Sequence, residues 1–131
     1  MQHDLSDWTI IIVDDEPDNL GVLELVLRYH HAQVQIASSG QQCLDLLDSV
    51  VPTLLLVDIQ MPGISGYDLL KRVREQSRWS QLPMIAVTAH AMQGDEDRIV
   101  AAGFSGYISK PIDAMKLAET LKAMVTVNVA Q

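Results

Sequence analysis

The chain has 131 residues, 48% of them hydrophobic, and this length suits a single compact domain. Its formal net charge of −8 argues against direct binding to nucleic acid or an anionic membrane, because both need a basic protein face. One cysteine cannot form an intramolecular disulfide, and no apolar stretch approaches the roughly 20 residues of a membrane span. These features favour a reduced, cytoplasmic setting.

Apolar runs typical of strands alternate along the chain with amphipathic stretches typical of helices. In chain order they are a strand at 8–13, a helix from Pro17 to about Tyr29, a strand at 33–36, a helix from Ser39 through Leu47, a strand at 54–57, a helix from Ser65 to about Ser77, a strand at 84–87, a helix at 95–102, a strand at 106–109 and a helix from Asp113 through Met124. This alternation predicts a parallel sheet with right-handed crossovers and helices on both faces. The expected fold class is α/β, a doubly wound five-stranded sheet in the flavodoxin-like order 2-1-3-4-5.

Several helix ends carry the residues that begin or terminate helices. Pro17 suits the first helical position, and Ser39 with Gln42 fits a capping box. Asp113 can cap the last helix, and Gly103 is a plausible residue for the end of the fourth.

The stretch from Leu54 to Gly66 organises the rest of the chain. Its apolar run suits a strand buried on both faces, and the run stops abruptly at Asp58. The strand at 8–13 likewise ends in acids, Asp14 and Asp15. Strands one and three are neighbours in the expected order, so these three carboxylates should meet at the carboxyl edge of the sheet, where ligands gather in such folds.

Three carboxylates in one crevice repel one another unless a cation lies between them or their pKa values rise. Oxygen ligands suit Mg²⁺, or Mn²⁺, better than Zn²⁺, for which the sequence has no His and Cys cluster. Thr88 and Lys110 end strands four and five at the same edge, and they add a hydroxyl and an ammonium suited to a phosphoryl group. Each residue alone has a plainer interpretation, as a helix-start acid, a strand residue or a surface cation. Their convergence on one predicted edge favours the functional interpretation.

Four motifs resemble the receiver domain of bacterial two-component response regulators, of the stand-alone, CheY-like kind. They are I-I-I-V-D-D-E-P (10–17), L-L-L-V-D-I-Q-M-P-G-I-S-G (54–66), I-A-V-T-A-H-A-M (85–92) and G-Y-I-S-K-P (106–111). The resemblance covers about Thr9 to Met124 and implies one receiver domain over 1–131. It implies that Asp58 accepts a phosphoryl group from a histidine kinase or phosphotransfer protein. The Mg²⁺ ligands would be Asp14, Asp15, Asp58 and the backbone carbonyl of Gln60.

The resemblance also implies a switch and an output. Thr88 and Tyr107 would change position together, and the face of the fourth helix, fifth strand and fifth helix would bind a downstream protein. Gln60 and His90 would set the lifetime of the phosphorylated state. The Lys110–Pro111 bond is expected to be cis. Such a domain catalyses only its own phosphorylation and dephosphorylation.

Two other functions fit parts of the pattern. A haloacid-dehalogenase-like phosphatase also has a nucleophilic aspartate, but it carries a second acid two residues later, where this chain has Gln60. A receiver with an intact pocket used only for protein binding is the other. The chain could act alone or as a piece of a larger regulator or hybrid kinase. Neither a P-loop nor G-x-G-x-x-G is present, so the sequence indicates no nucleotide cofactor.

Overall fold

The structure is a computed structural model that describes residues 5–61, 63–88, 95–110 and 112–129. Its elements in chain order are β1 (Thr9–Val13), α1 (Pro17–Tyr29), β2 (Gln33–Ala37), α2 (Gly40–Leu47), β3 (Leu54–Asp58), α3 (Gly66–Arg74), the short 3₁₀ helix η1 (Ser77–Trp79), β4 (Met84–Thr88), α4 (Asp95–Ala102), β5 (Gly106–Ser109) and α5 (Leu117–Val129). The predicted alternation of strand and helix is confirmed. The predicted role of His90 and the predicted cis bond before Pro111 lie outside the described residues.

The five strands form one parallel sheet in the order β2-β1-β3-β4-β5, as predicted. Val13 pairs with Val57 between β1 and β3, so the two strands end side by side. Thr88 pairs with Ser109 between β4 and β5. All carboxyl ends of the strands therefore lie at one edge of the sheet.

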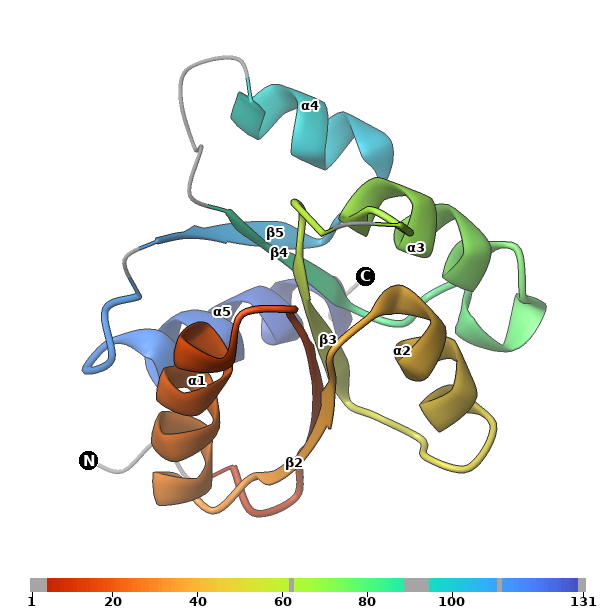
Figure 1. Ribbon diagram of the computed structural model, residues 1–131. Coiled ribbons are helices and arrows are strands. Elements are labelled where there is room, and N and C mark those ends of the chain that lie inside the picture. Colours follow the sequence, from red (N-terminus) through yellow and green to blue (C-terminus); the bar gives the residue numbers. More distant parts are fainter. Residues whose placement is uncertain (1–4, 62, 89–94, 111, 130–131) are drawn as a thin grey trace.

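Helices cover both faces of the sheet (Figure 1), and each face has its own core. The helices α1 and α5 pack on one face, where Leu23 and Leu121 lie in a core with Ile12 of β1. The helices α2, α3 and α4 cover the other face, where the buried core includes Cys43. Burial raises the pKa of the Cys43 thiol to about 12, so this cysteine acts as a small buried hydrophobe.

Two predicted helix starts are partly wrong, because local side-chain hydrogen bonds differ from those expected. Ser39 accepts from the Gln42 N–H, but the Gln42 side chain accepts from Ser38 and does not close a capping box. Asp113 accepts from the backbone N–H of Met115 and so forms a turn instead of a helix cap. The last helix consequently begins at Leu117.

Candidate functional site

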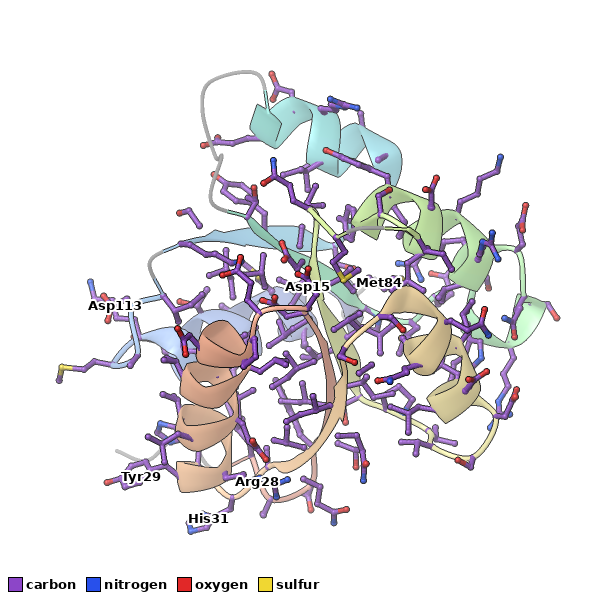
Figure 2. The ribbon with its side chains drawn as sticks, in the orientation of Figure 1. Asp15, Arg28, Tyr29, His31, Met84 and Asp113 are labelled. Carbon is purple, nitrogen blue, oxygen red and sulfur yellow. The ribbon has the colours of Figure 1, made fainter. Side chains whose placement is uncertain are left out.

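Three carboxylates meet at the carboxyl edge of the sheet, as the sequence predicts. Asp14 and Asp15 follow β1, and Asp58 is the last residue of the neighbouring strand β3. One carboxylate oxygen of each lies within 4.8 Å of the others. Asp14 is 1% exposed and Asp58 3% exposed, whereas Asp15 is exposed. Figure 2 shows Asp15 close to the strand ends, with Tyr29 and His31 at the opposite end of α1.

The two buried carboxylates each use one oxygen to accept a backbone N–H from two residues further on. The Glu16 N–H donates to Asp14 Oδ1 at 2.9 Å, and the Gln60 N–H donates to Asp58 Oδ1 at 3.1 Å. These bonds fix the rotation of both carboxylates. The second oxygen of each lies near the Lys110 ammonium.

Lys110 supplies the positive charge that faces these second oxygens. Its Nζ lies 3.6 Å from Asp14 Oδ2 and 3.7 Å from Asp58 Oδ2, so it interacts with both charges from beyond ordinary hydrogen-bond distance. Asp14 Oδ2 is buried and has no hydrogen-bond partner among the described residues. A buried carboxylate oxygen in this state fits a divalent cation, since hard cations prefer oxygen ligands.

Thr88 and Lys110 lie at this same edge, so the three acids, the hydroxyl and the ammonium that the sequence predicts to converge all lie at one end of the sheet. The Lys110 N–H donates to the Thr88 carbonyl at 2.8 Å and so continues the pairing of β4 and β5. Thr88 is 3% exposed. The Lys110 side chain is 13% exposed, because it runs inward toward the acids.

Electrostatics at the site raise the pKa of Asp58 to about 6. Burial is the main cause, and the neighbouring Asp14 carboxylate adds to it. The Gln60 N–H and the Lys110 ammonium act in the opposite direction, because both favour the ionised carboxylate. A divalent cation at the acids would add a further charge that favours ionisation.

Gly66, the first residue of α3, holds the loop that follows Asp58 close to the strand end. Its N–H donates to the Ile59 carbonyl at 3.0 Å. A Cβ at this position would lie 2.7 Å from the Asp58 carbonyl oxygen and 2.7 Å from Ile59 Cα. Both contacts are with backbone, so only glycine fits at this position.

Sequence reasoning missed a partner of the predicted switch residue Tyr107. The half-buried ring packs against the core under α2, α3 and α4, and the nearby Glu96 side chain of α4 raises the pKa of Tyr107. Glu96 carries no sequence signal for this role, because an acid in the first turn of a helix is already explained by the helix dipole.

The family model for the response regulator receiver domain matches residues 10–122. The chain belongs to this family. It is 36% identical over 115 residues to the polar-differentiation response regulator DivK of Brucella ovis, covering 88% of this chain and 94% of that protein. Receiver domains are phosphoacceptor switches of two-component signalling and not ordinary enzymes.

Solved receiver domains have the same fold. A putative response regulator from Chloroflexus aurantiacus superposes with a TM-score of 0.85 at 34% identity, covering 91% of this chain and 98% of that one. The receiver domain of the sensor histidine kinase PA1611 from Pseudomonas aeruginosa superposes with a TM-score of 0.82 at 29% identity, over 91% of this chain and 98% of its own. That receiver domain has a magnesium ion coordinated in its active-site cleft. In the part of this chain that the structure describes, no helix is long and apolar enough to cross a membrane.

Proposed function

We propose that this receiver domain accepts a phosphoryl group on Asp58 from the phosphohistidine of a histidine kinase or phosphotransfer protein, in a Mg²⁺-dependent reaction. The observation that carries the proposal is the set of contacts made by the two oxygens of the Asp58 carboxylate. One oxygen is held by the Gln60 N–H, and the other lies 3.7 Å from the Lys110 ammonium and within reach of two further acids.

The cation would be held by Asp14, Asp15, Asp58 and the backbone carbonyl of Gln60. When bound, Mg²⁺, or Mn²⁺ in its place, supplies positive charge to the oxygens of the transferred phosphoryl group. The ligand set is supported by the cluster of three carboxylates and by the unpartnered Asp14 Oδ2.

In the transfer, an oxygen of Asp58 attacks phosphorus in line with the donor. A bond forms between that oxygen and phosphorus, the phosphorus–nitrogen bond of phosphohistidine breaks, and its electron pair returns to the imidazole ring. Lys110 neutralises the charge on the phosphoryl oxygens, and the Thr88 hydroxyl donates a hydrogen bond to one of them. The domain thus catalyses its own phosphorylation. A water molecule oriented by Gln60 then hydrolyses the aspartyl phosphate.

The phosphorylated state would be transmitted through Thr88 and Tyr107. Movement of Thr88 toward the phosphoryl group opens space for the Tyr107 ring, and the surface of α4, β5 and α5 then binds a downstream protein in the cytoplasm. The position of Glu96 supports this route, because this side chain of α4 lies close enough to the Tyr107 hydroxyl of β5 to raise its pKa.

Intact mass spectrometry after incubation with acetyl phosphate tests the proposal. Wild type should gain the mass of one phosphoryl group in Mg²⁺ and none in a chelator. Asp58→Asn should gain none in either buffer. Asp48→Asn, which changes an exposed acid at the end of α2, is the matched control and should behave like wild type. A gain of the same size in Asp58→Asn contradicts the proposal.

A further inference from the structure

Gly40, the first residue of α2, touches the loop that follows the proposed phosphoryl acceptor. A Cβ at position 40 would lie 2.9 Å from both Cβ and Cγ2 of Ile64, which belongs to the loop between β3 and α3. The Ile64 side chain is half-buried and packs against the core on this face of the sheet. The missing side chain at Gly40 therefore makes room for Ile64.

The four residues 37–40, here called the β2–α2 connection, contact both halves of the acid site. At one end, the carbonyl of Ala37 accepts the N–H of Asp14 at 3.1 Å. At the other end, Gly40 contacts Ile64, which lies four residues after Gln60. The connection thus links the backbone that carries one acid to the loop that orients another.

Gln42 holds the β2–α2 connection in place by accepting two hydrogen bonds and donating one. Its side-chain oxygen accepts from the Ser38 N–H at 2.8 Å and from Ser38 Oγ at 3.0 Å. Its own N–H donates to Ser39 Oγ at 3.2 Å. These hydrogen bonds hold the backbone that leads into Gly40. A Cβ added at Gly40 would therefore displace Ile64 instead of this backbone.

The loop that carries Ile64 is anchored on both sides of this residue. At its far end, Gly66 is packed against the Asp58 and Ile59 backbone and bonded to the Ile59 carbonyl. At its near end, the Gln60 N–H donates to Asp58 Oδ1. Displacing Ile64 would therefore strain the loop between Gly66 and Gln60, whose N–H orients the Asp58 carboxylate.

We infer that Gly40 is a positioning residue for the phosphoryl-acceptor site, acting through Ile64 on the loop that carries Gln60. This inference rests on the proposed function. A methyl group at position 40 would force a displacement of roughly half an ångström before the contact reaches ordinary van der Waals separation. Displacements of this order at a reacting group are enough to slow a reaction severalfold or more.

Gly40→Ala tests the inference, with Gly21→Ala as the matched control, because a Cβ at helical Gly21 would meet nothing within 4 Å. We expect Gly40→Ala to weaken Mg²⁺ binding and slow phosphorylation by acetyl phosphate about tenfold. The Gln60 amide resonance of the metal-free protein should also shift. Gly21→Ala should match wild type in all three measurements.

The double variant Gly40→Ala with Ile64→Gly distinguishes positioning from general damage. Removing the Ile64 side chain frees the space that the new methyl group needs, so the Mg²⁺ affinity of the double variant should return toward wild type. The double variant also tests the inference if Gly40→Ala alone fails to fold.

A Gly40→Ala protein that is less stable but keeps the wild-type Mg²⁺ affinity, phosphorylation rate and Gln60 amide shift overturns the inference. So does a double variant that recovers nothing. Failure of the proposed function looks different, because wild type itself would then neither bind Mg²⁺ nor gain a phosphoryl group. The Gln60 amide of the metal-free variants would still report on the contact.

Discussion

Asp58 is a buried carboxylate whose ionisation costs stability in the metal-free protein. Its pKa is raised from 3.8 to about 6, so the folded protein binds this proton more tightly than the unfolded chain does. The folded state is therefore favoured most below about pH 4, loses stability as the pH rises to about 6, and keeps that loss at higher pH. The shift corresponds to roughly 3 kcal/mol.

Asp58→Asn should remove this pH dependence. In chelator, we expect the variant to be more stable than wild type at pH 7 by roughly 1 to 3 kcal/mol, and the difference should shrink as the pH falls toward 4. Urea unfolding at several pH values measures it, and groups common to both proteins cancel in the difference. Parallel pH profiles for the two proteins would show that burial of Asp58 does not have this cost.

A substitution at Asp15 allows metal binding and metal-free stability to be tested separately, because Asp15 is the one exposed member of the acid cluster. We expect Asp15→Asn to weaken Mg²⁺ binding at least tenfold, since a charged ligand is lost. Without metal, loss of repulsion should raise the free energy of unfolding slightly, by about 0.5 kcal/mol or less, because solvent screens an exposed charge. Calorimetric titration and urea unfolding measure the two effects. A variant less stable than wild type in chelator would contradict the picture of three crowded carboxylates.

At the scale of elements, the sequence predicts the helices and strands well where apolar periodicity is bounded by proline, glycine or a charge. The fourth helix and fifth strand fall where predicted, and Gly103 has the positive φ of 118° expected after a helix. The sequence predicts less well which side chain accepts a hydrogen bond from which backbone N–H, as at Gln42 and Asp113. Several short polar groups compete for such bonds, and sequence spacing alone does not rank them.

The end of α1 offers a stability test at this scale. His31 follows the helix with a φ of 76°. Its N–H donates to the Arg28 carbonyl and the Ala32 N–H donates to the Leu27 carbonyl, which is the hydrogen-bond pattern of a Schellman motif. The left-handed backbone conformation is strained for a residue with a Cβ and is relaxed for glycine.

We therefore expect His31→Gly to raise the free energy of unfolding by roughly 0.5 to 1 kcal/mol, measured by urea unfolding. His30→Gly is the control. Its φ of −89° is an ordinary one, so glycine there should lower stability. A loss of stability in both variants would mean that contacts of the His31 ring outweigh the backbone strain.

At the scale of the molecule, the candidate site follows from topology, because parallel strands deliver the acids, Thr88 and Lys110 to one edge. Sequence patterns therefore predict which residues gather there. They do not predict the long-range contacts that set the geometry. The contact between Gly40 and Ile64 joins residues far apart in the chain, and Glu96 of α4 raises the pKa of Tyr107 on β5.

The proposed switch makes a prediction about the surface formed by α4, β5 and α5. Beryllofluoride with Mg²⁺ mimics a phosphoryl group on an aspartate, so its addition should shift amide resonances along this surface as Thr88 and Tyr107 move. In Asp58→Asn the same addition should leave them unchanged. Resonances of that surface that are identical with and without beryllofluoride in the wild-type protein would contradict the switch.

Chemical identification of the phosphorylated residue tests the central claim most directly. Borohydride reduces an aspartyl phosphate to homoserine, and peptide mass spectrometry locates that residue in the chain. After incubation with acetyl phosphate and Mg²⁺, we predict homoserine at position 58 and none at positions 14 or 15. Homoserine at another aspartate, or an unmodified Asp58 in a protein that has gained a phosphoryl group, would contradict the account.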